Sequence, residues 1–348
     1  MHLLNVKLLR DIWRSRWQFI AVVAIVMLGI AFYQAAWTSY LNIGSSYETY
    51  YRMTNFHDFE IPCKSAPDSV AEKIERLPGI SAAHARIVQE SQVDLREDGD
   101  ERVVGRFISV PNSGRAAVDD IIVQKGIYPG APHKKQILVE KTFAEHHELD
   151  VGDYIHPVVY GEQFDYRIVG IAVSPEYIYA IESKQYLMPT PQTFGVFWVR
   201  RGQAEDLFGL ASRASSVVAR ASDDLRQRAM QIVHGMLAGY GAEEPVPRED
   251  QPSNYLLQMD LEGYKSMAVF FPLLFLFCAA LTIYTLMVRI VNSQRNQIGF
   301  LRASGVPVHV LTRHYLLYSL ICGGLGSVLG VSLGLYLSWL LTRFYLQF

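Results

Sequence analysis

The chain has 348 residues, half of them apolar, and a formal net charge of −2. Between Ser39 and Lys265 lie 33 of the 34 acidic and 23 of the 32 basic residues, so the two flanking pieces hold nine basic residues and one acid, Asp11. Basic edges around an acidic middle argue against nucleic acid as a partner. They suit a protein with a few membrane spans and one large domain outside the cytoplasm.

The N-terminal segment is basic and partly apolar, and we expect a cytoplasmic juxtamembrane helix over residues 1–16. It runs into about 22 mostly apolar residues, enough to cross a bilayer. Residues 17–40 are therefore the first predicted transmembrane helix. A cleaved signal peptide is the alternative, because Ala35-Ala36 resembles a cleavage site. The long apolar core and its flanking aromatic residues favour a retained span.

Residues 41–265 form the predicted extracytoplasmic domain. A helix after Pro67-Asp68 ends at Pro78-Gly79, and a second, over 223–239, ends at a glycine. Apolar patterning predicts strands at 83–95, 101–110, 137–140, 154–159, 164–173, 194–200 and 216–221. A strand–helix–strand set that is interrupted by an insertion, roughly 121–193, and then completed predicts a split α+β fold.

A Pro-rich acidic link and a stalk helix precede the second predicted span, residues 266–288. Pro272 lies near the outer end of this span, where it is tolerated in the first turns or marks a kink. A connector (289–314), a third span (315–341) and a short C-terminal end (342–348) follow. The predicted fold class is a membrane protein with three α-helical spans and a large α+β extracytoplasmic domain inserted between the first and second spans.

The connector holds four arginines and no acid, which predicts a cytoplasmic location by the positive-inside rule. Ile298, Leu301 and Gly305 share a face at the helical period, so residues 292–304 are predicted to form an amphipathic helix that Gly305 and Pro307 end. One interpretation is a basic segment that grips anionic lipid headgroups. The other is a helix that contacts a cytoplasmic partner.

The third span carries small residues at every fourth position, namely Cys322, Gly326, Gly330, Gly334 and Ser338. Such a ridge lets another helix approach closely. The sequence leaves two alternatives open: the partner helix belongs to the same subunit, or it belongs to a second subunit.

The run RNQIGFLRASGVPVHVL, followed by a glycine-rich helix, resembles the signature of FtsX-like permeases of ABC transporters. The segment 126–174, with its VGD turn, resembles the exported core of MacB-type members. The resemblance implies that the connector is a coupling helix docking on a separate ATPase, through Arg295, Ile298, Gly299, Leu301, Arg302, Ala303 and Gly305. Family members often have an acid directly before the Ile-Gly pair, where this chain has Gln297, which cannot form an ion pair.

The resemblance also implies a multi-pass protein of the bacterial plasma membrane, with ATP and magnesium held by the partner ATPase. Further implied partners are a second or paired permease, membrane lipid and, in some members, a periplasmic adaptor. The family closes its core with a fourth span, whereas three are predicted here. We expect the missing span either later in a longer permease or in another chain.

No catalytic, cofactor or metal site is predicted in this chain. The phosphate-binding pattern GxxxxGK[ST] is absent, and His146-His147-Glu148 lacks zincin spacing and is expected to be helix surface. Cys63, alone in the exported domain, is expected to be buried rather than reactive. The spans hold no Asp, Glu or Lys, which argues against ion-coupled transport.

The predicted function is a non-catalytic permease subunit that couples ATP hydrolysis by another chain to movement of its extracytoplasmic domain, for export or extraction of a substrate. The alternative is a membrane-tethered extracytoplasmic sensor or scaffold that uses no ATPase.

Overall fold

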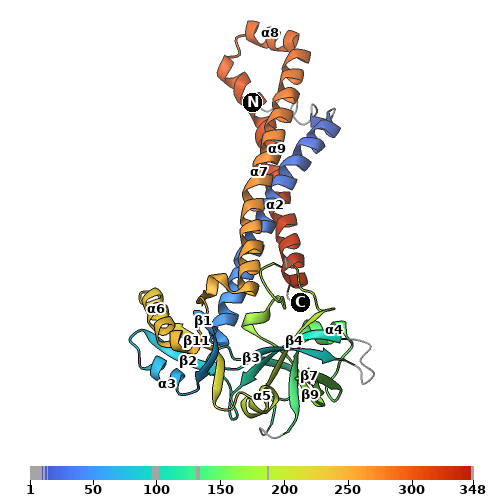
Figure 1. Ribbon diagram of the computed structural model, residues 1–348. Coiled ribbons are helices and arrows are strands. Elements are labelled where there is room, and N and C mark those ends of the chain that lie inside the picture. The colour runs from blue at the N-terminus through green and yellow to red at the C-terminus, as the bar shows by residue number, and fades with distance from the viewer. Residues whose placement is uncertain are drawn as a thin grey trace. The chain divides into compact units, whose positions relative to one another are not determined.

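The computed structural model describes residues 10, 12–13, 15–95, 102–130, 134–185 and 188–345. Most of the predicted juxtamembrane helix and the last three residues of the chain lie outside the described residues. The chain divides into two compact units, a membrane unit (Met1–Ser46 and Asp260–Phe348) and a sheet unit (Tyr47–Met259). Two long helices, α2 and α7, each contribute residues to both units (Figure 1).

Three long helices build the membrane unit: α2 (Arg16–Met53), α7 (Pro252–Ser293) and α9 (Val308–Tyr345). Each has a stretch long and apolar enough to cross a membrane, which confirms the three predicted spans. A short helix, α8 (Arg295–Ala303), connects α7 to α9. Because α7 already begins at Pro252, Pro272 lies well inside it, where its ring removes one backbone hydrogen bond.

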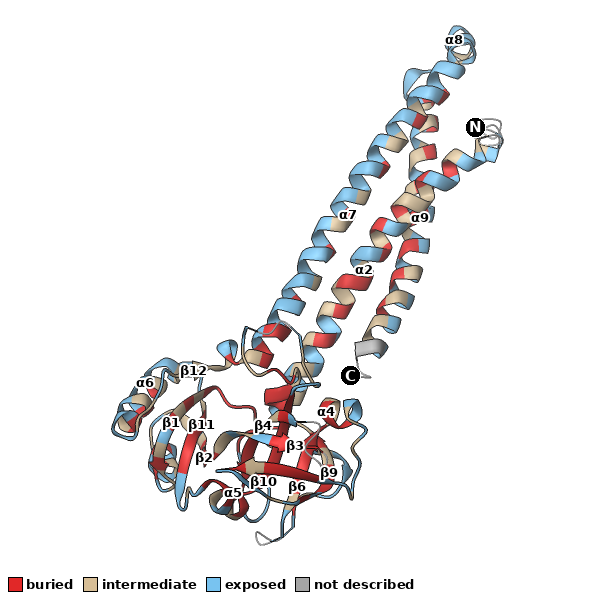
Figure 2. Cartoon of the chain, turned by 45° about the vertical axis from the view of Figure 1, so that its right-hand side comes forward, coloured by how far each residue is buried: buried red, intermediate tan, exposed pale blue. Residues whose placement is uncertain are grey.

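The membrane helices expose large apolar side chains along much of their length, and α7 is coloured mostly as exposed in Figure 2. Phe270, Leu273 and Phe277 on α7 are each more than 60% exposed. Such a surface would be costly in water and fits contact with lipid. A buried apolar cluster joins the three helices through Phe19, Val22, Leu286, Ile290, Tyr318 and Cys322.

The smaller sheet of the sheet unit has the order β12-β1-β11-β2, with neighbours antiparallel. Helices α3 (Val70–Glu75) and α6 (Arg226–Leu237) share its apolar core. The predicted split α+β layout is confirmed, because the larger sheet is inserted between β2 and β11. The strands are β1 (Phe59–Pro67), β2 (Ile80–Arg86), β11 (Arg213–Ala221) and β12 (Val246–Pro247).

The larger sheet has the order β5-β9-β6-β10-β4-β3-β7-β8, and a further pairing of β7 with β9 closes β9, β6, β10, β4, β3 and β7 into a ring. Strand β10 is buried at every residue, which explains its uninterrupted apolar run. The strands are β3 (Val88–Asp94), β4 (Arg102–Val110), β5 (Ile122–Gly126), β6 (Gln136–Glu140), β7 (Tyr154–Val159), β8 (Glu162–Gln163), β9 (Tyr166–Val173) and β10 (Phe194–Arg200).

Short helices fill the remaining connections of the sheet unit. Helix α4 (Lys141–His146) follows β6 directly, and α5 (Arg201–Phe208) follows β10. Three single 3-10 turns are η1 (Pro175–Tyr177), η2 (Ala238–Tyr240) and η3 (Arg248–Asp250). The larger sheet thus takes up residues 88–200, a wider stretch than the insertion predicted at 121–193.

The prediction of one strand over 83–95 is wrong, because the chain leaves one sheet for the other within it. Strand β2 ends at Arg86 and β3 begins at Val88. Between them, Ile87 exchanges hydrogen bonds with Ser109, its N–H donating to Oγ at 2.8 Å and its carbonyl accepting from the Ser109 N–H at 2.9 Å. The change of sheet carries Arg86 into the interior of the sheet unit.

Candidate functional site

Helix α8 ends in a well-formed glycine cap. Gly305 has φ +87°, in the left-handed region that favours glycine. The N–H of Val306 donates to the carbonyl of Leu301 at 3.1 Å, and the N–H of Gly305 donates to that of Arg302 at 3.0 Å. This pair of bonds is a Schellman motif, and it satisfies two carbonyls that a helix end would leave without partners. The predicted stop at Gly305 is confirmed.

The predicted coupling residues divide between two faces of α8. Ile298 and Leu301 are half-buried, whereas Arg295, Gly299, Arg302 and Ala303 are exposed. The prediction that Gly305 shares the face of Ile298 and Leu301 is wrong, because Gly305 lies beyond the end of α8 and is exposed. A Cβ built on Gly299 meets no atom within 4 Å. Phe300, which the sequence did not single out, is 73% exposed on this short helix. At 3.6 residues per turn, Phe300 lies on nearly the opposite side of α8 from Arg295 and Arg302. The exposed surface of α8 thus offers arginines and small residues on one side and an aromatic ring on another, residue types that occur in protein interfaces.

The corner that carries α8 is tied to the spans on both sides. The Gln294 N–H, at the start of α8, donates to the carbonyl of Ile290 in α7 at 3.0 Å. The Tyr315 hydroxyl of α9 donates to Gln294 Oε1 at 2.8 Å. Tyr315 also stacks on Tyr318, which is fully buried in the apolar cluster. A displacement of α8 would therefore be passed to α7 and α9 rather than absorbed by a loose loop.

The glycine ridge of α9 packs against α2 of the same chain, and we call this contact the glycine seam. A Cβ on Gly326 would lie 2.8 Å from Val26 Cβ, and one on Gly330 would lie 2.7 Å from the carbonyl oxygen of Met27. A Cβ on Gly334 would lie 2.6 Å from Gln34 Cβ. No real Cβ tolerates such distances, so only glycine permits this approach. The sequence left open whether the partner helix belongs to the same subunit or to a second one. In the structure it is α2 of the same subunit.

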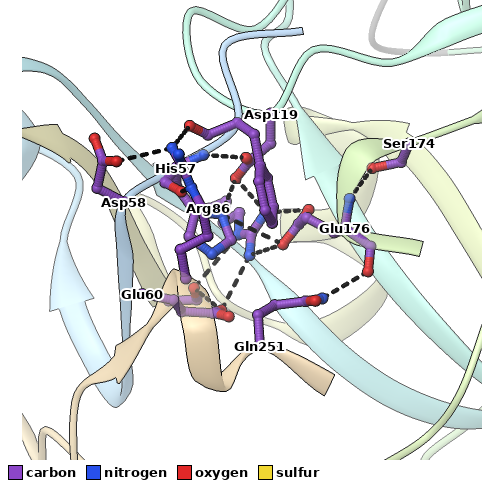
Figure 3. Close-up of polar contacts among 11 residues, drawn as sticks. His57, Asp58, Glu60, Arg86, Asp119, Ser174, Glu176 and Gln251 are labelled. Atoms are coloured by element: carbon purple, nitrogen blue, oxygen red, sulfur yellow. Dashed lines mark hydrogen bonds and ion pairs between the residues drawn. The ribbon is translucent and has the colours of Figure 1, made fainter. Parts of the chain in front are cut away.

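A second polar site, the ion cluster (His57, Glu60, Arg86, Asp119 and Glu176), lies in the sheet unit (Figure 3); Glu60 is half-buried and the other four residues are buried. The Arg86 guanidinium donates to Glu176 at 2.6 Å (Nη2–Oε1) and 2.7 Å (Nη1–Oε2). It also donates to Asp119 Oδ2 at 3.2 Å and to Glu60 Oε1 at 3.0 Å. His57 Nδ1 lies 2.8 Å from the same Asp119 oxygen. Sequence reasoning missed this cluster because its members are far apart in the chain.

The ion cluster joins the two sheets. Glu60 in β1 and Arg86 in β2 come from the smaller sheet, whereas Asp119 precedes β5 and Glu176 lies in η1, directly after β9. The ends of both long helices reach the same place. His57 follows α2, and Gln251, directly before α7, donates through Nε2 to the carbonyl of Glu176 at 2.6 Å.

Electrostatics in the ion cluster favour a charged imidazole. Burial by itself lowers the pKa of His57, but the Asp119 carboxylate outweighs it, so the pKa of His57 is raised. Burial raises the pKa of Glu176, and Arg86 offsets this only in part. Burial also acts on Asp119, yet His57 and Arg86 hold its pKa below the usual range. Three carboxylates thus face one arginine and one histidine.

His57, Asp119 and Glu176 also have the residue types and spacing of a metal site. Their ligand atoms lie within 4.8 Å of one another. The Arg86 guanidinium, however, already donates to both carboxylates and supplies the positive charge that an ion would bring. These residues therefore fit a salt-bridge network better than a metal ion.

Other residues considered from the sequence have ordinary surroundings. Cys63 is buried, and burial raises the pKa of its thiol, which disfavours the reactive thiolate. His146 is exposed at the end of α4, and His147 Nε2 lies 2.8 Å from the carbonyl oxygen of Pro191. These groups give no further sign of a reactive site.

Comparison with known proteins identifies the C-terminal part of the chain. Residues 269–348 match the family model described as FtsX-like permease C-terminal. This segment contains the larger part of α7 together with α8 and α9. The resemblance to FtsX-like permeases is thus confirmed where the coupling-helix motif lies. A search of curated proteins finds no match.

Three solved structures are similar to part of the chain. The extracellular domain of the noncanonic ABC-type transporter YknZ from Gram-positive bacteria is 13% identical (TM-score 0.38) and covers 53% of this chain and 97% of its own. The periplasmic region of MacB from Actinobacillus actinomycetemcomitans is 8% identical (TM-score 0.36) and covers 60% of this chain and 95% of its own. A domain of a putative permease protein from Porphyromonas gingivalis is 12% identical (TM-score 0.30) and covers 54% of this chain and 87% of its own.

The match of the C-terminal segment to FtsX-like permeases and the three helices that are long and apolar enough to cross a membrane fit a multi-pass protein of the bacterial plasma membrane. By the positive-inside rule, the connector with α8 lies in the cytoplasm and the sheet unit lies outside it.

Proposed function

We propose that this chain is the membrane subunit of an ABC complex and that α8 docks on a separate cytoplasmic ATPase. The observation that carries the proposal is the form of α8: a short basic helix, tied to α7 and α9 at its start and closed by a glycine cap, whose exposed surface includes Phe300, Arg295 and Arg302. It lies within the segment that matches the FtsX-like permeases.

In the proposed cycle, ATP-driven closure of the ATPase displaces α8 and the spans follow. The hydrogen bonds of Gln294 couple α8 to α7 and α9, and the glycine seam couples α9 to α2. Helices α2 and α7 continue into the sheet unit, where Tyr51 donates its hydroxyl proton to Asn254 Oδ1 at 3.0 Å. Movement of the spans would thus reach the sheet unit next to the ion cluster and act on a substrate outside the cytoplasm.

The proposed complex has further members. The ATPase would hold ATP and magnesium, and a second or paired permease would complete the membrane part. A periplasmic adaptor and bound lipid are additional candidates. The chain itself has no assigned catalytic role in this proposal.

Affinity purification of the tagged full chain from native membranes tests the docking surface. We expect the wild-type chain to retain an ATPase with a phosphate-binding loop, and Phe300→Asp to lose it, because a charge replaces an exposed ring of the proposed docking surface. Loss of an interface hot spot of 2 kcal/mol or more weakens binding by roughly 30-fold. The amount of folded chain should not change.

Gln297→Glu is the matched control, since it places a negative charge on the same exposed helix but keeps the ring. It should retain the ATPase. If Phe300→Asp keeps the ATPase as well as the control does, α8 is not the docking site. A wild-type chain that purifies without any ATPase in several mild detergents would favour the tethered sensor or scaffold instead.

A further inference from the structure

A pocket of about 490 Å³ opens between the C-terminal half of α2 and the C-terminal end of α9. Its polar lining comes from Thr38 and Asn42 on α2 and from Ser338, Thr342 and Arg343 on α9. By the positive-inside rule this end faces the outer leaflet of the membrane. We call it the outer pocket.

The outer pocket is rich in hydrogen-bond donors. Thr38 Oγ1 accepts from Gln34 Nε2 at 2.9 Å, which leaves its own O–H free to donate. Asn42 Nδ2 approaches Thr342 Oγ1 at 3.4 Å and has a second N–H. Arg343 is exposed and adds a guanidinium with five N–H groups.

Ser338 adds a buried hydroxyl beside the outer pocket. It is 2% exposed, lines the outer pocket, and its hydroxyl has no hydrogen-bond partner within the described part of the chain. Other serines of α9 behave differently: Ser327 and Ser332 donate to the carbonyls four residues before them, at 2.7 and 3.0 Å. A buried hydroxyl without a partner is costly, so an acceptor from outside the chain would relieve it.

The charge at the outer pocket is positive. Its lining contains no Asp or Glu, and no carboxylate among the described residues lies within 4.0 Å of the Arg343 guanidinium. Arg343 instead lies over the ring of Trp339, 5.4 Å from its centroid. A cation with several donors and no acid is a site for an anion, and planar guanidinium groups suit phosphate oxygens.

Apolar residues of the same pocket identify the source of that anion. Leu335 and Trp339 complete the lining and are 52% and 54% exposed on the apolar surface of α9. A free phosphate ion would gain nothing from them, whereas a lipid places its headgroup beside its own acyl chains. Tryptophan at this level is typical of the membrane interface.

We propose that the outer pocket binds the phosphate group of an anionic phospholipid from the outer leaflet. The Arg343 guanidinium pairs with the phosphate, the Ser338, Thr38 and Asn42 donors complete its hydrogen bonds, and an acyl chain lies along Leu335 and Trp339. The bound lipid bridges α2 and α9 beyond the end of the glycine seam. The proposal rests on the membrane location and not on ATPase coupling, so each can fail without the other.

Native mass spectrometry of the delipidated full chain in detergent tests this, with phosphatidylglycerol as the probe. We expect a one-to-one adduct with wild type and about tenfold weaker binding with Arg343→Gln, the effect of losing one charge-assisted contact. Ser338→Ala should also weaken binding, by a smaller factor. It removes only the hydroxyl group, so the packing of α9 against α2 should not change. Arg289→Gln removes an equal exposed charge near the opposite end of the membrane unit and should leave binding unchanged.

Two competitors distinguish the sources of the phosphate. Phosphatidylcholine should bind at least several-fold more weakly than phosphatidylglycerol, and inorganic phosphate at millimolar concentration should not displace the lipid. Equal binding of both lipids, or displacement by inorganic phosphate, overturns the proposal. So does unchanged phosphatidylglycerol binding in both Arg343→Gln and Ser338→Ala; if Arg343→Gln does not fold, Ser338→Ala alone decides.

Discussion

The glycine seam of the membrane unit and the ion cluster of the sheet unit solve the same problem by opposite means. In the seam, α9 meets α2 through positions where even a methyl group would lie under 3.0 Å from its neighbour. In the cluster, β1, β2, η1 and the segment before β5 are held by one arginine and the carboxylates around it. Both join segments that are far apart in the chain.

The surroundings explain the difference. In lipid, apolar side chains gain nothing from leaving the solvent, so close backbone packing holds the helices together. In the sheet unit, water provides the driving force for burial, and the apolar cores of the two sheets already use it. The ion cluster fixes how the two sheets are oriented, because a bidentate arginine fits only one arrangement of its partners. The seam is therefore sensitive to volume and the cluster to charge.

Removal of the Arg86 charge should have the largest effect. Arg86→Met leaves the buried Asp119 and Glu176, and the half-buried Glu60, without their shared cation, a change that costs roughly 3–5 kcal/mol. Hydrogen exchange of the full chain in detergent, read on peptides covering β2 and β3, should show faster exchange there. Peptides from α9 should not change.

Arg86→Lys is the control for this prediction. It keeps the charge but loses the planar fork that reaches three carboxylates, so its effect should be smaller than that of methionine and larger than zero. Equal protection in wild type and Arg86→Met would mean that the ion cluster does not hold the two sheets together.

Added volume at the seam should have the next largest effect. Gly330→Leu forces a side chain toward the Met27 carbonyl and should destabilise the α2–α9 contact by about 1–3 kcal/mol. A cysteine pair placed across α2 and α9 should then crosslink less efficiently in membranes. Gly324→Leu, at a position of the same helix where a new Cβ meets nothing within 4 Å, should leave crosslinking intact. Equal loss in both variants would contradict the role of the seam.

The sequence was sufficient to predict features with a local pattern. Long apolar runs predicted the three spans, Gly305 predicted the end of α8, and the four-residue spacing of Gly326, Gly330 and Gly334 predicted a close helix contact. Strands β7 and β10 also begin and end as predicted, since apolar patterning and turn residues mark them within a few positions.

Long-range features were out of reach. Nothing near Arg86 marks a change of sheet, because the run 83–95 has strand-forming residues throughout, and its partners Glu60 and Glu176 lie 26 and 90 residues away. The partner of the glycine ridge was likewise undetermined, since the spacing of small residues is the same for a contact within one chain and between two. Phe300 was missed because an apolar residue in an amphipathic helix is usually assigned to the buried face.

A change in the protonation of the ion cluster should have the smallest effect on stability. It distinguishes the two contacts, because the stability of the ion cluster depends on pH and that of the glycine seam does not. The pKa of His57 is raised in the folded state, so its contribution to stability is fully present below the unfolded value of about 6.5 and is lost as pH rises through the folded value. The raised pKa of Glu176 acts in the same direction, because its ionised form is disfavoured in the folded chain. Glu60 and Asp119, with lowered pKa values, stabilise above about pH 4 and lose that contribution in acid.

His57→Gln isolates the alkaline part of this dependence, because glutamine can still donate to Asp119 but cannot become charged. Strand β2 should therefore be better protected from hydrogen exchange in wild type than in His57→Gln. The difference in protection should be largest at about pH 6 and should shrink toward pH 9. Exchange rates need correction for their intrinsic pH dependence, and the α9 peptides, whose seam has no titrating group, supply that internal reference. A difference between wild type and His57→Gln that stays constant over this range would mean that His57 acts by shape and not by charge, and the contrast between the two contacts would then rest on Arg86 alone.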